Sequence, residues 1–433
     1  MNTRFRAGSI DRPVSGARPL HKRWSLAVLP LLAVALAAFA QTAAAQGACE
    51  ASAYGMRPGA EDNLAALTRA LKACAGKTLH IAAGSYELSP KGFGTGLMVP
   101  AGTSIAGDGR EGATRTVLRV GSSGNFQAVF WTRNVSNVSI HGLRFEGSSY
   151  ESGCTRHLDY GHAIYLYSDA GEHRSVEGID ISDNEFHNFN GQSWITVNAE
   201  DGSPGIGRGS LISIKNNVFD SDESLRGGCA GTGGIGYPNA MVWLHGSDKS
   251  AQGLVSNVSV ASNKFNAGYV KGAVAIWSGT SRISVQYNVI RDVGLKLPPA
   301  PGAEQGRYAV SIYNSAHDAV HDLPGLHPDT IWVVGNEITN PVSCGIYVAV
   351  AQNLDISRNR ISGQVDRFDG TLPKGAIALN HASKVFSLKD NELSNNYIGI
   401  SSVASEVNLG NNRIVASPGG SATKIRGGSP ESR

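Results

Sequence analysis

The sequence predicts an all-β fold: a single-stranded right-handed parallel β-helix of about 10 coils with an N-terminal α-helical cap. Two patterns predict it. A segment of the form apolar-x-apolar-x-x-Asn-x-apolar recurs along the chain, and a short apolar triplet precedes each copy. The closest copies lie about 21 to 23 residues apart, which is the length of one coil of three short strands. Because a repeat fold lengthens by adding coils, 433 residues fit one long domain.

Residues 1–45 have the pattern of a secretory signal peptide. Six basic residues precede an apolar run from Leu26 to Ala40, and Ala43–Ala45 offers a small-residue cleavage site. The run is shorter than the roughly 20 residues that span a bilayer. We therefore expect a secreted or periplasmic protein that has no membrane contact after the signal is cleaved.

Removal of the signal changes the charge balance, because it carries six of the 38 basic residues and one of the 35 acidic residues. The mature chain is then close to neutral. A general nucleic-acid partner loses its support, and any basic site must be local.

The remaining chain divides into three predicted parts. Residues 46–77 form an N-terminal segment with the capping helix, where Glu61–Asn63 offers helix-start chemistry and leucines follow at helical spacing up to Gly76. Residues 78–416 form the β-helix domain. Residues 417–433 are rich in Gly, Ser and charged residues, so we expect a disordered tail.

One asparagine recurs at the same place in every copy of the repeat. Such a residue tolerates a left-handed backbone conformation at a turn and can bond its side chain to the next coil. We expect these residues to stack into a structural ladder inside the solenoid. They are Asn184, Asn217, Asn263, Asn288, Asn336, Asn359, Asn391 and Asn412.

The triplets, such as Ile164–Leu166, Ile195–Val197 and Val242–Leu244, have apolar outer members. A period of two points these outer members inward and the middle residue outward. Stacking the inward set from coil to coil predicts one continuous aliphatic core.

Five cysteines in an exported chain suggest disulfides. Cys49 and Cys74 flank the helical segment, and Cys154 and Cys229 lie in Gly-rich insertions, so these are the preferred pairs. Cys344 begins a strand and is interpreted as a buried thiol.

The opening GAEDNLAALTRALKACAGKTLHIAAGSYEL, followed by TSIAGDGREGATRTVLRV, resembles the start of the pectate-lyase-like superfamily of right-handed β-helices. The resemblance covers about residues 55–416 and implies a substrate cleft on the outward face of the first strand of each coil. The polygalacturonase, main pectate lyase and mannuronan epimerase motifs are absent, so no subfamily residues are carried over. Calcium, common in the lyase branches, is compatible with the sequence but not required by it, and no metal site is predicted.

Aromatic and polar side chains occupy the outward positions of the triplet strands. Pyranose rings pack their C–H faces on such aromatic rings, although rings covered by loops would form a satellite core instead. Adjacent coils stand about 4.8 Å apart, so several sugar units would fit along the row. The predicted substrate-binding residues are Tyr165, Asn198, Trp243, Trp277, Tyr313, Tyr347 and Asn380, together with Lys374 at a strand entrance.

Two kinds of chemistry are compatible with these strands. Lys271 and Arg307 precede neighbouring strands at the same offset, where cations could neutralise a uronate carboxylate and remove its α-proton in β-elimination. His245 on the outward face is a candidate acid or base. Hydrolysis would need two carboxylates; the outward triplet positions hold none, and Asp201 and Asp248 after the strands are the nearest candidates.

These observations favour a polysaccharide lyase that cleaves an acidic, uronate-containing polysaccharide. A glycoside hydrolase with a carboxylate pair is one alternative. A non-catalytic periplasmic protein that binds or assembles exopolysaccharide is the other, because a fold alone does not fix a function. We expect a monomer.

Overall fold

The computed structural model describes residues 49–89, 96–120, 127–147, 161–189, 191–225, 238–250, 252–297, 306–313, 326–364, 374–402 and 409–425, with backbone alone at 381–386 and 425. All of them lie in one unit, Ala48–Arg433. The predicted signal peptide and the predicted Cys154–Cys229 pair lie outside the described residues.

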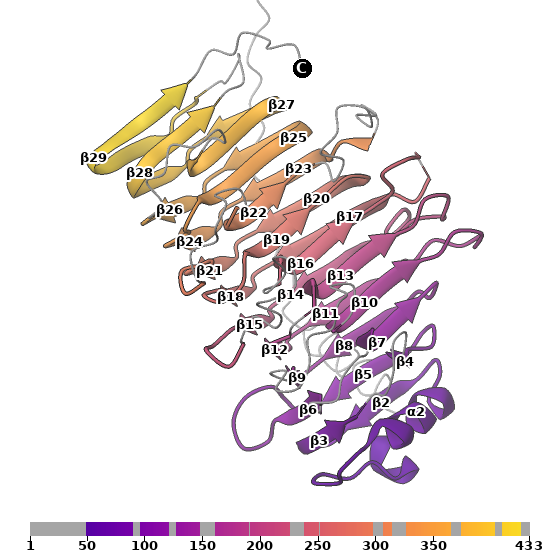
Figure 1. Cartoon of the computed structure of the whole chain (residues 1–433). Coiled ribbons are helices and arrows are strands. Elements are labelled where there is room, and N and C mark those ends of the chain that lie inside the picture. The colour runs from indigo at the N-terminus through magenta and orange to yellow at the C-terminus, as the bar shows by residue number, and fades with distance from the viewer. Residues whose placement is uncertain are drawn as a thin grey trace, which may run out of the picture. The chain divides into compact units, whose positions relative to one another are not determined.

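Each coil contributes strands to three parallel sheets, and each strand pairs with its counterpart in the next coil (Figure 1). The first sheet contains the predicted triplets. Its strands are β4 (Gly96–Met98), β7 (Ala128–Arg133), β10 (His162–Ser168), β13 (Ser193–Ala199), β16 (Ala240–His245), β19 (Gly272–Ile276), β22 (Tyr308–Ile312), the first halves of β25 (Cys344–Ser357) and β27 (Gly375–Lys389), and the second halves of β28 (Glu392–Ser402) and β29 (Arg413–Ile425).

The second sheet precedes the asparagine turn, and β1 (Cys49–Glu50) pairs with its first strand. Its strands are β2 (Thr78–Ile81), β5 (Ser104–Gly107), β8 (Val138–His141), β11 (Ile179–Ser182), β14 (Ile212–Lys215), β17 (Val255–Ala261), β20 (Thr280–Gln286), β23 (Asp329–Val334) and the second halves of β25 and β27.

The third sheet follows the asparagine turn. Its strands are β3 (Gly84–Leu88), β6 (Thr116–Val120), β9 (Leu143–Glu146), β12 (Glu185–His187), β15 (Val218–Asp220), β18 (Lys264–Asn266), β21 (Val289–Arg291), β24 (Glu337–Thr339), β26 (Arg360–Ser362) and the first halves of β28 and β29.

The inward side chains of all three sheets form one hydrophobic core, as the period of two predicts. Ile164, Ile195 and Val242 are in register on the first sheet and are fully buried. On the third sheet, four phenylalanines stack with centroid distances of 5.0, 4.9 and 4.6 Å along the series Phe145, Phe186, Phe219 and Phe265. Parallel in-register pairing therefore places like residues on like residues.

The asparagine ladder is confirmed. The main-chain N–H of each ladder residue donates to Oδ1 of the next at 2.9–3.0 Å, and each Nδ2 donates to a carbonyl oxygen of the preceding coil. The expected left-handed backbone, however, lies one residue earlier, for example at Asp183, Asn216 and Ser262. The turn is made by that residue, and the asparagine lies directly before the next strand with its side chain buried.

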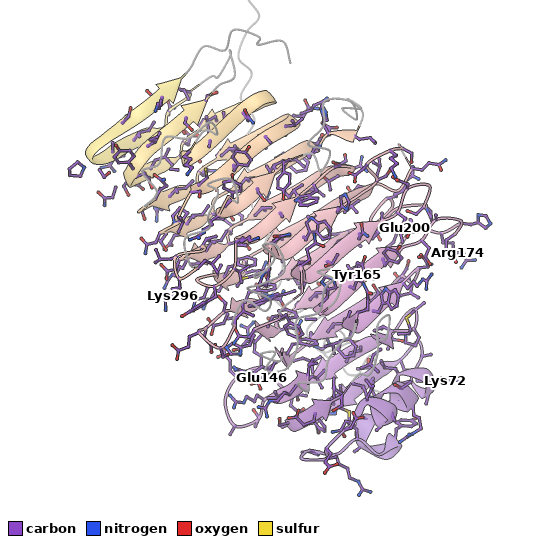
Figure 2. The ribbon with its side chains drawn as sticks, viewed as in Figure 1. Lys72, Glu146, Tyr165, Arg174, Glu200 and Lys296 are labelled. Atoms are coloured by element: carbon purple, nitrogen blue, oxygen red, sulfur yellow. A yellow bond between two sulfur atoms is a disulfide. The ribbon has the colours of Figure 1, made fainter. Side chains whose placement is uncertain are left out.

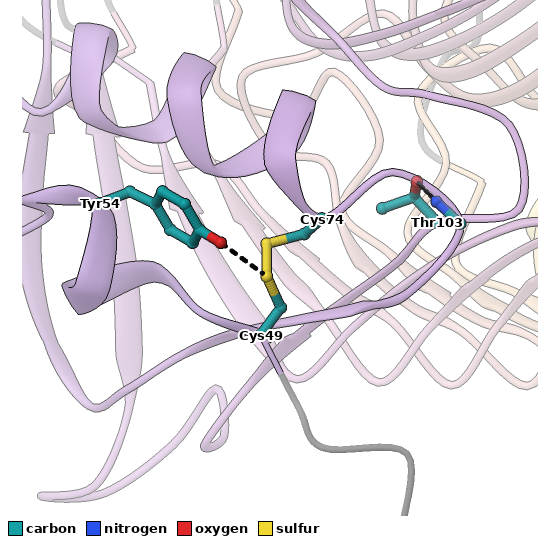
Figure 3. The surroundings of a disulfide bond; sticks show 5 residues. Cys49, Tyr54, Cys74 and Thr103 are labelled. Carbon is teal, nitrogen blue, oxygen red and sulfur yellow. Dashed lines mark hydrogen bonds between the residues drawn. A yellow bond between two sulfur atoms is a disulfide. The ribbon is translucent and has the colours of Figure 1, made fainter.

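A 3-10 helix, Ala51–Tyr54, and the helix α2 (Leu64–Ala73) form the N-terminal segment. Leu67 and Leu71 of α2 are buried in the same core as the coils. The capping role of the helix remains a prediction. The predicted Cys49–Cys74 disulfide is present, with a Cα–Cα distance of 5.9 Å, and the Tyr54 hydroxyl lies 3.4 Å from Cys49 Sγ (Figure 3).

The C-terminal boundary differs from the predicted one at Ala416. Strand β29 runs to Ile425, and Ser421 to Ile425 pair with Ile398 to Ser402 of β28. Main-chain hydrogen bonds hold this segment although its composition is polar, because sheet pairing needs no apolar side chain. Among the described residues, no helix is long and apolar enough to cross a membrane.

Candidate functional site

We call the outward side of the first sheet between Trp131 and Asn380 the aromatic face. Two columns of side chains run along it in register. The first contains Trp131, Tyr165, Thr196, Trp243, Ala275, Ser311, Tyr347 and Ala378. The second begins with Arg133, Tyr167, Asn198 and His245. Four of the eight predicted binding residues therefore lie in these columns: Tyr165, Asn198, Trp243 and Tyr347.

A pocket of about 380 Å³ opens on this face at β7, β10 and β13. Trp131 and Tyr165 contribute its aromatic rings, which lie nearly parallel with centroids 6.2 Å apart. Asn198 holds Tyr165 through a hydrogen bond of 3.1 Å from Nδ2 to the phenol oxygen. The lining residues are Gln127, Trp131, Arg133, Tyr165, Tyr167, Asp169, Ala170 and Glu200.

Two carboxylates line this pocket, and each follows a strand of the first sheet. Figure 2 labels one of them, Glu200, and the ring of Tyr165. Asp169 follows β10, is mostly buried, and accepts hydrogen bonds from Arg133 Nε and, at 2.8 Å, from Asn134 Nδ2. Glu200 follows β13 and is exposed. It accepts a hydrogen bond from the Tyr167 hydroxyl on Oε1 and one of 3.0 Å from the Ala170 N–H on Oε2. The neighbouring coil thus positions both acids.

These hydrogen bonds affect the charge states of Arg133 and Tyr167. The hydrogen bond to Asp169 raises the pKa of Arg133, so the two groups form an ion pair. The Arg133 guanidinium also lies over the Trp131 ring, 5.5 Å from its centroid. Burial, followed by the bond to Glu200, raises the pKa of Tyr167, which therefore stays a neutral donor.

Where β13 and the next strand β16 end, the predicted residues His245, Asp248 and Asp201 gather at one edge of the face. His245 Nε2 lies 3.2 Å from both carboxylate oxygens of Asp248. Asp201 accepts hydrogen bonds from Ser247 Oγ and from the Lys249 N–H at 3.2 Å. The Asp201 carboxylate is therefore an anchor for the loop that carries Asp248.

The predicted aromatic residues of the next coils contact one another. His245 stacks on Trp243 at 5.1 Å, Trp277 meets Trp243 edge to face at 4.9 Å, and Tyr313 lies 4.8 Å from Trp277. These side chains are partly buried. Burial raises the pKa of Tyr313 well above its ordinary value. The four side chains therefore form one aromatic cluster on the face.

Lys271 and Arg307 lie at the opposite, entering edge of the first sheet, and neighbouring coils bring them together as expected. Burial, and then the charge of Arg307, lowers the pKa of Lys271. The Arg307 guanidinium donates to the carbonyl oxygens of Gly294 and Leu297 at 2.8 and 3.3 Å. Arg307 thus braces a turn, whereas Lys271 is the group with perturbed basicity.

Tyr347 differs from the expectation that it is exposed. It faces outward but is only 6% exposed, because it stacks on Tyr308 at 4.3 Å and packs on Cys344 and Ala378. Burial raises its pKa to about 12. Asn380 and Lys374 belong to the following coil and are partly buried. Among the described residues, no group of three or more His, Cys, Asp or Glu could hold a metal ion.

Sequence reasoning missed Trp131, Arg133, Asp169 and Glu200. The segment Ala128–Arg133 has the same alternation as the other triplets, but its coil carries Leu143 where later coils carry the ladder asparagine. The repeat pattern therefore did not include it. The two acids lie just past the ends of their triplets, where the sequence analysis selected Asp201 and Asp248 instead.

No family model matches the sequence, and no curated protein is significantly similar to it. Solved structures, however, share its fold. The surface adhesin PfbA of Streptococcus pneumoniae aligns with a TM-score of 0.54 at 11% identity over 88% of this chain and 90% of its own. The fold is a right-handed parallel β-helix.

The tailspike of Escherichia coli bacteriophage HK620 aligns with a TM-score of 0.50 at 11% identity over 88% of this chain and 60% of its own, and was solved with a pentasaccharide. The A-module of the Azotobacter vinelandii mannuronan C-5 epimerase AlgE4 aligns over 89% of this chain and 99% of its own at 14% identity and a TM-score of 0.42. At these identities the likeness concerns the fold alone.

Proposed function

We propose that this protein binds a polysaccharide along the aromatic face and hydrolyses it in the pocket. One observation carries the proposal: two aromatic rings, Trp131 and Tyr165, and two carboxylates, Asp169 and Glu200, line the same pocket. Sugar rings pack on aromatic faces, and glycoside hydrolysis uses a pair of carboxyl groups beside the scissile bond. The HK620 tailspike, which has the same fold, was solved with a pentasaccharide, so this architecture is compatible with such a ligand.

The surroundings of the two acids suit different roles. Glu200 is exposed at the pocket and forms no ion pair among the described residues, so of the two acids it is the one that can take up a proton and deliver it to the leaving oxygen. Asp169 is mostly buried and paired with Arg133, so it can attack the sugar or activate a water molecule as a carboxylate. Tyr167 and Asn134 hold these groups in place through their hydrogen bonds.

Elimination on an acidic polysaccharide is the second candidate, and the perturbed Lys271 favours it. A lysine whose pKa is lowered by burial has a larger neutral fraction and can remove a proton. Its partner Arg307 is engaged with main-chain oxygens, so the neutralisation of a uronate would require Arg307 to leave them.

One experiment distinguishes hydrolysis from elimination. A panel of neutral and acidic polysaccharides is incubated with the protein, and reducing ends and unsaturated product are measured in the same samples. Hydrolysis predicts reducing ends without unsaturation, and a loss of about 10²- to 10⁴-fold in Glu200→Gln. Asp183→Asn removes an exposed acid at a turn that suits asparagine, so it is the matched control.

Unsaturated product that disappears in Lys271→Ala and persists in Glu200→Gln would replace hydrolysis with elimination. Glycan binding without product in either assay would leave a non-catalytic binding protein.

A further inference from the structure

The pocket of the proposed site is lined by more acidic than basic side chains, and this difference affects which sugar it can bind. We propose that it binds a neutral, hydroxyl-rich hexopyranose and disfavours a uronic acid at this position. The inference rests on the proposed role of the pocket as a sugar site. The sequence led us to expect an acidic polysaccharide. If the polymer contains both neutral and charged sugars, this inference places its charged sugars outside the pocket.

The charged groups of the described lining are one guanidinium and two carboxylates. Arg133 is compensated by Asp169, with which it forms an ion pair, and its guanidinium lies against Trp131. Glu200 forms no ion pair among the described residues: its hydrogen-bond donors are the Tyr167 hydroxyl and the Ala170 N–H, and Arg133 acts on it only through its charge at longer range. With Glu200 in its carboxylate form, which is the form that binds sugar before any proton transfer, the described lining therefore has an excess of one negative charge.

A neutral sugar can donate hydrogen bonds from its hydroxyl groups to this lining. A carboxylate offers about four acceptor sites, so Glu200 retains acceptors for sugar hydroxyl protons after its two bonds are made. The Trp131 and Tyr165 rings in the lining add apolar contact that does not depend on the charge of the sugar. A uronate would lose these hydroxyl donations at its carboxylate and would meet Glu200 with the same sign of charge.

The size of the discrimination follows from electrostatics. Two like charges about 4 Å apart in a water-like medium repel by about 1 kcal/mol, which is roughly a 5-fold difference in affinity. Salt weakens this repulsion, because the Debye length falls from about 10 Å at 0.1 M to about 3 Å at 1 M ionic strength.

The test uses isothermal titration calorimetry on the whole protein with matched oligosaccharides built from glucose, mannose or galactose. Each neutral oligosaccharide is compared with the same compound whose C6 alcohols are oxidised to carboxylates. The neutral member of at least one pair should bind about 5-fold more tightly or better. The gap should narrow at 1 M salt and in Glu200→Gln, and should persist in Asp183→Asn.

Equal or tighter binding of the oxidised member, a gap that Glu200→Gln leaves unchanged, or no binding of any neutral oligosaccharide would overturn the inference. Because binding is measured without turnover, a protein that binds neutral sugar and cuts nothing would refute only the proposed hydrolysis.

Discussion

Asn288, at the middle of the ladder, provides a quantitative test of how the coils are held together. The residue is fully buried. Its Oδ1 accepts the main-chain N–H of Asn263 at 2.9 Å and the Asn263 Nδ2 at 3.1 Å. Its Nδ2 donates to the Val260 carbonyl oxygen at 2.9 Å and to Asn336 Oδ1 at 3.0 Å. One side chain thus links three coils.

Asn288→Ala removes all four bonds. Asn263 Nδ2 keeps its bond to the Ile214 carbonyl, and Asn336 Oδ1 keeps the Asn288 N–H. The Asn263 N–H and the Val260 carbonyl are left buried without these partners. A buried group that loses its partner costs about 1–3 kcal/mol, so the free energy of unfolding should fall by about 2–6 kcal/mol.

The measurement is urea unfolding of the whole protein, with amide hydrogen exchange at Asn263 as the local readout. Asn412→Ala is the matched control, because Asn412 lies at the last ladder position and is only partly buried, where water can replace the lost bonds. A loss below about 1 kcal/mol for Asn288→Ala, or a loss equal to that of Asn412→Ala, would refute the reasoning.

Two further predictions concern other parts of the chain. Burial lowers the pKa of His80, but bonds of 2.8 Å to Glu50 and 2.7 Å to Asp108 raise it more, so the net pKa is above 6.5. The resulting stabilisation is fully present below that ordinary value and is lost as pH rises through the folded-state pKa. His80→Gln should therefore flatten the pH dependence of the unfolding midpoint; an unchanged slope speaks against this. Phe219→Ala, which opens the stack between Phe186 and Phe265, should cost about 3–5 kcal/mol in urea unfolding, and a near-neutral result would show that the rings contribute little.

Sequence patterns predicted the coils because each coil is set by the repeat spacing and by the alternation of apolar residues within a short segment. The spacing of Asn263 and Asn288 equals one coil of chain, and the alternation in Val242–Leu244 decides which side chain enters the core. Once such coils stack in parallel, equivalent residues coincide, so the columns of the aromatic face followed from the triplets. The buried state of Tyr347 did not follow, because it depends on Tyr308 of the neighbouring coil.

The pocket shows more clearly what the sequence alone could not predict. Asp169 and Glu200 are separated by 31 positions in sequence and occur after different strands, with nothing local that pairs them. They line one hollow because the register of β10 on β13 places Ser168 beside Ala199, directly before the two acids. The loops between coils vary in length, so this neighbourhood is fixed by hydrogen bonding across the sheet and not by a constant sequence interval.

The sequence by itself thus determined the solenoid, the ladder, the aliphatic interior, the Cys49–Cys74 pair and the outward face, since each depends on periodicity or on nearby residues. Only the tertiary structure decided that Trp131 and Arg133 extend that face, that Arg307 braces a turn, and that two carboxylates share a pocket. Those facts depend on which atoms of adjacent coils meet, and a side chain's direction and partners are fixed only when the coils are stacked.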